Sequence, residues 1–310
     1  MVNFRFHLVS ITAVFLALGL GIVIGAGVVD RATVEFLEQR LDTVRENADR
    51  TNRENDELSR LLGQWGAFTD EAGDQLLEGR LRDTRVLVLG AQGTDRRAVD
   101  ALTVSLAAAG ARHDGTLWFT GKLRLDTTAD VDALAAVVGA PLERRPEVVR
   151  RAALTGMAEA WRAGSVTPVL AAMVGAGFVT YQPTEGAEVD LSLLPRSGTR
   201  FIVVSSDQPE VPNTDLAAVL VKELARAGTV PVLAAEVGHP VEGRTDTRGA
   251  FVLSLRSDTE VSGRISTVDN LEDWRGRVAA VLALEDLRAG RTGHFGIGPR
   301  AERLLPAPPP

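Results

Sequence analysis

The sequence predicts a membrane-anchored α/β protein: one N-terminal transmembrane helix, a coiled-coil stalk, then a Rossmann-like, largely parallel sheet with helices on both faces. Three observations predict this architecture. A charge-free apolar run lies near the N-terminus, a polar segment with heptad spacing follows it, and short continuous apolar runs alternate with helical patterns from residue 84 onward. Strands of a parallel sheet that is covered on both faces are continuously apolar.

These patterns divide the chain into six expected segments. They are a cytoplasmic tail (1–7), a transmembrane helix (8–29), a coiled-coil stalk (30–62), a linker helix (63–83), an extracytoplasmic α/β domain (84–300) and a disordered proline-rich tail (301–310).

The transmembrane helix is predicted by the run from Leu8 to Val29, which has no charged residue and can cross a hydrocarbon core of roughly 30 Å. Arg5 and His7 precede the run, so the positive-inside rule keeps the N-terminus in the cytoplasm and places the rest of the chain outside. The alternative is a cleaved signal peptide, with small residues at 25–27. Signal h-regions span only about 7–15 residues, which favours a retained single-pass anchor in the cell membrane.

Two surfaces predict a homodimer. In the membrane segment, Gly21 and Gly25 share a helical face with Ala17 and would let two helices approach closely, although glycine is also simply common in membrane helices. In the stalk, apolar residues follow the a and d positions of about four heptads, the usual threshold for a coiled coil. The positions that carry this prediction are Val34, Leu37, Leu41, Val44, Asn55, Leu58 and Leu62.

Asn55 at an a position is typical of a two-stranded coiled coil with a fixed register, at some cost in stability. Gly63 and Gly66 are expected to end the heptad pattern. The alternative is a single amphipathic helix that lies against the following domain.

The α/β domain is predicted from alternating signals. Strands are expected at 85–89, 115–120, 178–182, 201–205, 230–235 and 250–255, and helices at 68–81, 95–109, 130–138, 146–163, 166–175, 214–227 and 276–289.

Two turns after predicted strands are weak candidates for ligand binding. Gly90, Gly93 and Thr94 lie between the first strand and the next helix, where an anion can bind at a helix N-terminus. Ser205 and Ser206 end the later strand, where α/β proteins place ligands. Neither turn matches a nucleotide-binding motif, so an ordinary tight turn and a rigid proline-containing loop are the favoured interpretations.

The composition restricts the chemistry. The chain has no cysteine, which excludes disulfides, thiolate metal sites and thiol catalysis, and its net charge of −7 disfavours nucleic acid as a partner. The four histidines are not paired at ligand spacing, and no nucleophile motif is present, so we expect a protein that is not an enzyme and has no cofactor of its own. His294, in a glycine-rich segment, is the one weak candidate for a metal ligand. The acidic residues Asp258, Glu260, Asp269, Glu272 and Asp273 are expected to form a solvated face.

Several stretches together resemble the actinobacterial MctB family. They are FRFHLVSITAVFLALGLGIVIGAG near the N-terminus, GFVTYQ at 177–182, ISTVD at 265–269, AVLAL at 280–284 and GHFG at 293–296. The resemblance implies a cell-envelope protein of copper transport or copper homeostasis, with copper as a possible ligand by resemblance only. An outer-membrane channel fits poorly, because a membrane barrel needs many segments of about ten residues with alternating polarity.

Two functions therefore remain open. The resemblance implies a copper-homeostasis role in the cell envelope. The anchor, stalk and terminal domain instead favour a non-enzymatic scaffold or regulator that presents a partner-binding domain, with a cell-wall hydrolase or another division-linked membrane protein as the partner. An enzyme with a novel site is a third alternative.

Overall fold

The computed structural model describes residues 4–165, 168–184, 190–228, 230–238 and 250–307, apart from the side chains of 26–35, 65, 67–72, 74 and 192. The chain divides into two compact units, Met1–Phe68 and Thr69–Pro310, and each is described by itself.

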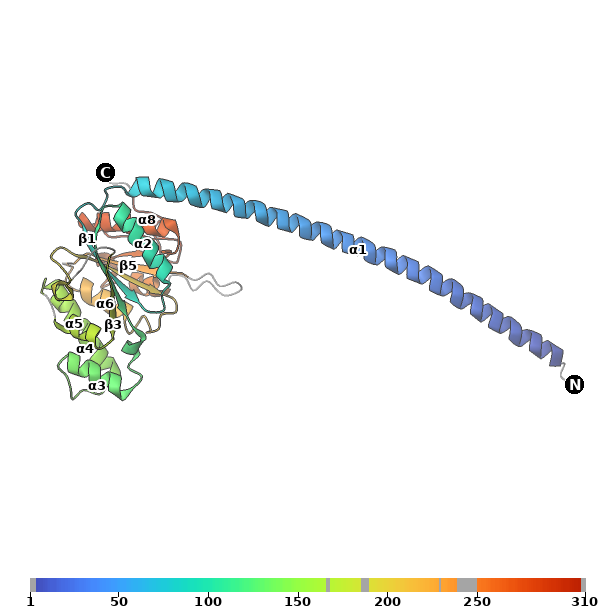
Figure 1. The fold of residues 1–310 in the computed structure, drawn as a ribbon, viewed down its shortest axis with the longest axis horizontal. Coiled ribbons are helices and arrows are strands. Elements are labelled where there is room, and N and C mark those ends of the chain that lie inside the picture. The colour runs from blue at the N-terminus through green and yellow to red at the C-terminus, as the bar shows by residue number, and fades with distance from the viewer. Residues whose placement is uncertain (1–3, 166–167, 185–189, 229, 239–249, 308–310) are drawn as a thin grey trace. The chain divides into compact units, whose positions relative to one another are not determined.

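The first unit is helical and belongs to α1 (Phe4–Leu77), whose last residues lie in the second unit (Figure 1). Its stretch Phe4–Gly25 is long and apolar enough to cross a membrane, in agreement with the predicted anchor. The helix continues through Gly63 and Gly66 to Leu77, so the first part of the expected linker helix (63–83) belongs to α1, and residues 78–83 form turns. A glycine inside a helix costs only about 1 kcal/mol, which a long helix tolerates.

The predicted pairing residues lie on the exposed surface of this helix. Gly21 and Gly25 have open space where a Cβ would stand. Leu37, Leu41, Val44, Leu58 and Leu62 are between 52% and 71% exposed, and Asn55 is also exposed. The side chain of Val34 lies outside the described residues. The homodimer and its coiled coil stay predictions.

The second unit contains a seven-stranded sheet in the order β3-β2-β1-β4-β5-β6-β7. All neighbouring strands are parallel except β2 and β3. The strands are β1 (Arg85–Ala91), β2 (Arg112–Phe119), β3 (Val179–Gln182), β4 (Arg200–Ser206), β5 (Val232–Val237), β6 (Ser266–Val268) and β7 (His294–Phe295). The predicted α/β fold with a largely parallel sheet is confirmed.

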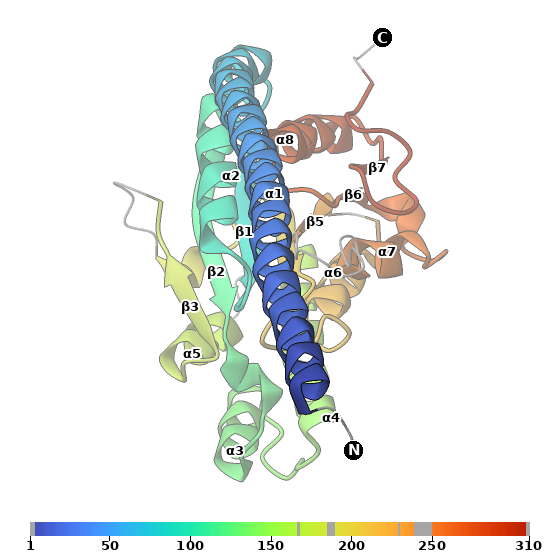
Figure 2. The same ribbon diagram turned by 90° about the vertical axis from the view of Figure 1, so that its right-hand side faces the viewer.

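Helices cover both faces of this sheet (Figure 2). They are α2 (Arg96–Ala108), α3 (Thr128–Val137), α4 (Pro146–Arg162), α5 (Pro168–Gly175), α6 (Ala217–Ala225), α7 (Ala250–Arg256) and α8 (Trp274–Arg288), with short 3-10 helices η1 (Gly121–Arg124), η2 (Leu191–Leu193) and η3 (Ser262–Arg264).

Alternate residues of the central strands build two cores. Leu87 and Phe201 pack with α3 to α7 on one face, and Val86 and Ile202 pack with α2 and α8 on the other. This two-sided burial explains why the strands are continuously apolar in sequence.

The sequence prediction fails at three places, where one expected strand is a helix and two short strands were not expected. The stretch 250–255 was expected to be a strand, and it is helix α7, whose residues Phe251, Val252 and Leu255 are buried. Short apolar runs do not distinguish a strand from one buried turn of helix. Strands β6 and β7 were not predicted, because they are only 3 and 2 residues long and contain Ser266, Thr267 and His294.

The tail also differs from the expected disorder as far as the structure describes it. Phe295 forms a bridge with Arg303, and the Glu302 N–H donates to the His294 carbonyl at 2.8 Å. Pro306 is buried. Residues 301–307 therefore continue the β7 edge of the domain, and residues 308–310 lie outside the described residues.

We predict that the fragment from Arg31 to Pro310 dimerises weakly through the heptad positions and that Asn55→Leu tightens this association while loosening the choice of oligomer. In the expected dimer the Asn55 amide would be buried between the two helices, which lowers the stability of the dimer, and leucine at this position removes that cost. Sedimentation analysis measures both effects.

Glu46→Leu is the matched control, because Glu46 is exposed and falls at an f position of the same heptad frame. If the fragment and its Asn55→Leu variant both sediment as monomers, the stalk is not a coiled coil.

Candidate functional site

The candidate ligand-binding residues come together at the carboxyl ends of β1 and β4. These strands are neighbours, with Gly90 opposite Val204, and the strand order reverses between them. Gly93 and Thr94 follow β1, and Ser205 and Ser206 end β4. This is the switch point at which open α/β sheets place their ligands.

The chain itself fills the switch point. The Glu210 N–H donates to the Gln92 carbonyl at 2.8 Å, and the Gly121 N–H donates to Gln92 Oε1 at 3.1 Å. Gly93 has a φ of +95°, and a Cβ on it would lie 2.8 Å from the Glu210 nitrogen. A Cβ on Gly90 would lie 2.6 Å from the Trp118 ring. Both glycines are therefore needed for the close approach of other parts of this chain.

The two serines at the carboxyl end of β4 form hydrogen bonds with other residues of this chain. Ser205 and Ser206 are fully buried. Ser205 Oγ donates to Asn213 Oδ1 at 2.6 Å, Asn213 Nδ2 donates to the Ser206 carbonyl at 2.8 Å, and the Gln208 N–H donates to Ser206 Oγ at 3.3 Å. The Thr94 hydroxyl is buried without a hydrogen-bond partner among the described residues. This geometry favours the turn and rigid-loop interpretations over a ligand site.

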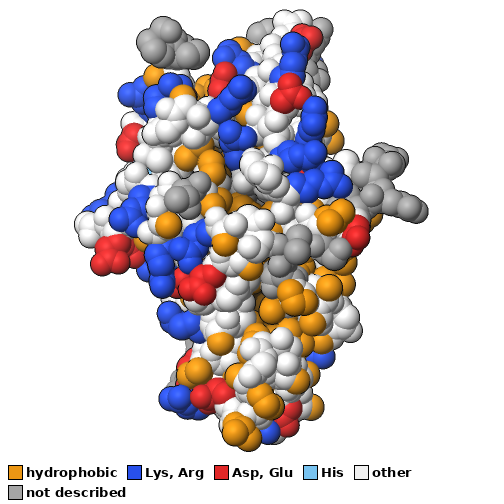
Figure 3. Space-filling view, turned by 90° about the vertical axis from the view of Figure 1, so that its left-hand side faces the viewer, with side chains coloured by type: hydrophobic (Ala, Val, Ile, Leu, Met, Phe, Trp, Pro, Cys, Tyr) orange, Lys and Arg blue, Asp and Glu red, His pale blue; other side chains and the backbone are white. Residues whose placement is uncertain are grey.

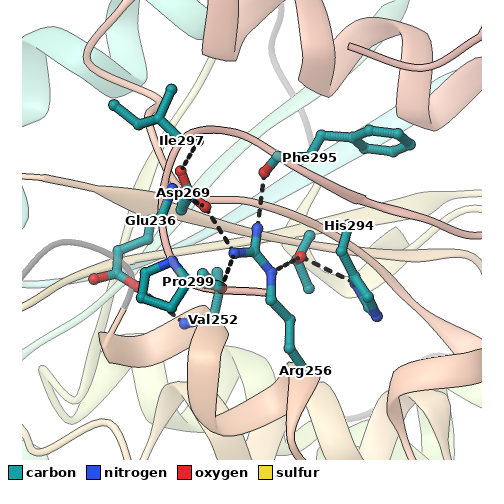
Figure 4. A network of polar contacts seen from close by, with 10 residues as sticks. Glu236, Val252, Arg256, Asp269, His294, Phe295, Ile297 and Pro299 are labelled. Carbon is teal, nitrogen blue, oxygen red and sulfur yellow. Dashed lines mark hydrogen bonds and ion pairs between the residues drawn. The ribbon is translucent and has the colours of Figure 1, made fainter. Parts of the chain in front are cut away.

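A second polar centre, which we call the Arg256 network, lies between α7 and the loop that follows β7 (Figure 4). Arg256 and Asp269 have fully buried side chains, and Arg256 Nη1 lies 2.7 Å from Asp269 Oδ2. Arg256 also donates to Thr267 Oγ1 at 2.8 Å, to the Phe295 carbonyl at 2.8 Å and to the Pro299 carbonyl at 2.9 Å. Each guanidinium nitrogen therefore has an acceptor, as a buried charge requires.

Asp269 also forms hydrogen bonds with the backbone of the glycine-rich loop after β7, residues 296–298. It accepts the Ile297 N–H at 2.8 Å and the Gly298 N–H at 3.0 Å. A Cβ on Gly296 would collide with Asp269 Oδ1, and one on Gly298 would lie 2.9 Å from Oδ2. The loop is glycine-rich because the carboxylate contacts its backbone directly.

The expected solvated face of acidic residues is therefore wrong for Asp269, which has no exposed surface. Glu272 accepts the Gly238 N–H at 2.8 Å, and Asp273 caps α8 by accepting the Arg275 N–H at 2.9 Å. Asp258 pairs with Lys222 at 2.7 Å, and Glu260 alone of the five is exposed. Sequence analysis missed Arg256, which ends the apolar run AFVLSLR and is followed by polar residues, so local sequence gave no signal of its burial.

Two further buried polar side chains escaped the sequence analysis. Glu236 ends β5 fully buried and accepts the Val252 N–H at 2.9 Å at the start of α7. Asn270 is fully buried after β6, and its amide has no hydrogen-bond partner within the described part of the chain.

His294 borders the Arg256 network. Its Nδ1 lies 3.1 Å from Thr267 Oγ1, the same hydroxyl that accepts from Arg256. Burial, and then the charge of Arg256, lower the pKa of His294 from its usual value, which favours the neutral imidazole. A neutral imidazole can bind a metal, but the adjacent guanidinium opposes a cation here.

The other sulfur and imidazole groups do not join His294. Met157 and Met173 are fully buried in the hydrophobic core. His113 lies on β2, five strand spacings from β7, which is about 24 Å. A metal ion holds nitrogen ligands at roughly 2 Å, so these two histidines cannot share one ion. His239 lies outside the described residues, and the described residues contain no group of three His, Cys, Asp or Glu able to hold a metal.

Comparison with known proteins assigns the chain to a family over nearly its whole length. The family described as "Copper transport outer membrane protein, MctB" matches residues 1–306. The "Copper transporter MctB" of Mycobacterium tuberculosis (strain ATCC 25618 / H37Rv) is 26% identical over 315 residues, which cover 96% of this chain and 97% of that protein. The protein of the same name from Mycobacterium leprae (strain TN) is 25% identical over 319 residues, covering 96% and 97%.

We predict that Asp269→Asn and Arg256→Met each lower the free energy of unfolding of the α/β domain by about 3–5 kcal/mol, because each leaves a buried charge without its partner. The double variant Arg256→Met/Asp269→Leu should cost less than the sum of the two single losses. Urea unfolding followed by circular dichroism measures these differences.

Asp132→Asn is the control, since Asp132 pairs with Arg144 at 2.9 Å while both side chains are about half exposed. Its loss should change stability by about 1 kcal/mol or less. Equal effects of Asp132→Asn and Asp269→Asn would contradict the importance of the Arg256 network.

Proposed function

The chain belongs to the MctB family, and from this membership we propose that it is a membrane-anchored envelope protein that acts in copper transport or copper homeostasis. The observation that carries the proposal is the extent of the family match, which includes the apolar stretch Phe4–Gly25 and the whole α/β domain to residue 306. The anchor and the domain therefore belong to one functional unit.

In this proposal the α/β domain lies outside the cytoplasm. Arg5 and His7 precede the membrane stretch and hold the short N-terminal tail inside. A reporter fused after Pro310 is expected to be active only outside the cytoplasm, and cytoplasmic activity of the fusion would contradict this topology.

We further propose that one α/β domain does not hold copper tightly by itself. Cu(I) prefers sulfur ligands and Cu(II) prefers clustered imidazoles. The two thioethers of the domain are buried in the core, His113 and His294 lie at distant strands, and His294 has a guanidinium beside it. The domain would then influence copper handling without being the copper carrier.

A scaffold or regulator is the second candidate, and the exposed apolar residues of the stalk favour it. Leu37, Leu41, Val44, Leu58 and Leu62 leave an apolar stripe on α1 that a second copy of the helix would cover. A dimeric stalk of residues 30–62 would span roughly 50 Å at 1.5 Å per residue and hold the α/β domains at that distance from the membrane. The partner in this case is a cell-wall or division-linked membrane protein, and no catalytic step is assigned to the domain.

A growth assay on copper separates the two functions. We predict that cells lacking this chain stop growing at a lower copper concentration than the parent and contain a different amount of copper. The full chain should restore tolerance, whereas the chain without residues 1–29 should not, because the anchor is part of the functional unit. Unchanged copper tolerance and copper content would contradict the copper role and leave the scaffold.

Copper titration of the purified chain in detergent tests the ligand argument independently. We predict that Cu(I) and Cu(II) are both removed by a competing chelator and that His294→Ala changes neither result. Stoichiometric, chelator-resistant binding that is lost in His294→Ala would show that copper is held at this residue.

A further inference from the structure

Arginines gather at the edge of the sheet where the parallel strands begin. Arg85 is the first residue of β1, Arg112 of β2 and Arg200 of β4, and these three strands are neighbours in the sheet. The charged side chains on this side of the molecule are mainly Lys and Arg (Figure 3). The chain therefore concentrates positive charge here although its net charge is −7.

The arginines that begin β1 and β2 have acidic partners. Arg85 Nη1 lies 3.0 Å from Asp114 Oδ1, and Arg112 Nη2 lies 2.6 Å from Asp83 Oδ1. These two ion pairs neutralise two of the cations, so free positive charge at this edge has to come from other residues.

Four other arginines at this edge have no acidic partner in the part of the chain that the structure describes. We call them the arginine face: Arg82, Arg196, Arg200 and Arg288. The acidic residues close to Arg288 in α8 are already paired, because Glu285 lies 3.4 Å from Arg80 and Asp286 pairs with Arg291. Glu78, which is exposed and likewise has no ion pair among the described residues, offsets one of the four charges. Positive charge therefore remains in excess.

Arg200 and Arg288 are close enough to repel one another. Arg200 is the register partner of Val86, whose side chain packs with α2 and α8, so the Arg200 side chain lies on that face of the sheet. Burial, and then the charge of Arg288 at the end of α8, lower the pKa of Arg200. The two guanidinium groups therefore have an unfavourable interaction that an anion between them would relieve.

Two tight turns place Arg82 and Arg196 at the same edge. In the turn before β1, the Arg82 guanidinium lies against Gly79, where an added Cβ would be 3.1 Å from Nη2. In the turn before β4, Thr199 donates from its N–H and its hydroxyl to the Arg196 carbonyl, at 3.2 Å and 2.7 Å. Arg82 is exposed and Arg196 is half-buried, so both side chains are accessible to a partner.

We infer that the arginine face binds an acidic segment of a partner protein. A guanidinium group binds a carboxylate through two parallel N–H donors, and several carboxylates in one segment would offset the excess charge of this edge. Leu193, which is 51% exposed and precedes the turn before β4, would give the same segment an apolar contact.

Anionic lipid headgroups are the competing source of negative charge. The attraction of a charged membrane falls off over about 8 Å at physiological ionic strength, whereas the proposed stalk would hold the domain roughly 50 Å away. An acidic protein segment is therefore the better match. The inference names the partner chemistry of the scaffold candidate and rests on its stalk, but it is independent of the copper role, which the growth assay tests separately.

Binding of fluorescently labelled poly-L-glutamate to the full chain in phosphatidylcholine nanodiscs tests this surface. We expect binding, measured by fluorescence anisotropy, that weakens as salt is added. The triple variant Arg82→Gln/Arg196→Gln/Arg288→Gln should weaken it about tenfold or more, because three charge-assisted contacts are lost. Arg82→Gln/Arg288→Gln changes only exposed side chains and replaces the triple variant if that chain fails to fold.

The matched control is Arg97→Gln/Arg151→Gln/Arg303→Gln, which removes three exposed arginines that lie away from this edge and also have no ion pair among the described residues. Equal weakening by the two triple variants would overturn the inference, because it would reflect general attraction between opposite charges. Failure of poly-L-glutamate to bind the wild-type chain would overturn it as well. Binding to phosphatidylglycerol vesicles as tight as to poly-L-glutamate would replace the protein partner with a lipid surface.

Discussion

The C-terminal third of the α/β domain depends on one buried ion pair, Arg256 with Asp269. Removing two charges from water is expensive, and the cost is offset only where every donor and acceptor is satisfied. Here the pair joins helix α7, strand β6 and the loop after β7 through backbone carbonyls and N–H groups. Strand β7 has only two residues and pairs with β6 through a short register, so its own hydrogen bonds are few. The ion pair supplies the contacts that this edge of the sheet lacks.

The way in which each element is stabilised determines whether the sequence alone predicts it. The strands around Leu87 and Phe201 are continuously apolar because both faces are covered, so their pattern is visible and they were predicted. Strand β6 contains buried Ser266 and Thr267, and its position is set by distant partners rather than by its own apolar residues. Asp269 was taken for a surface acid because the residue that neutralises it, Arg256, is a long-range contact that local spacing does not reveal.

The candidate ligand-binding residues also show that local sequence does not reveal long-range contacts. Gly93, Ser205 and Ser206 were located correctly at the edge where α/β folds place ligands. What the sequence did not show is that residues 208–210 and Asn213 occupy that edge. The arginine face at the other end of the strands joins the turn before β1, the turn before β4 and the end of α8, which are far apart in the chain. The function of the domain therefore has to be sought in surfaces that only the folded chain assembles, while its membrane stretch and family are visible in the sequence itself.

Hydrogen exchange at the Ile297 and Gly298 amides tests the dependence on the Arg256 network most directly. Both N–H groups donate to Asp269 in a segment that is otherwise an irregular loop. If the ion pair holds the loop, both amides exchange as slowly as amides of the central strand β4, and Asp269→Asn speeds their exchange while β4 remains protected. Rapid exchange of both amides in the wild-type chain would contradict the account.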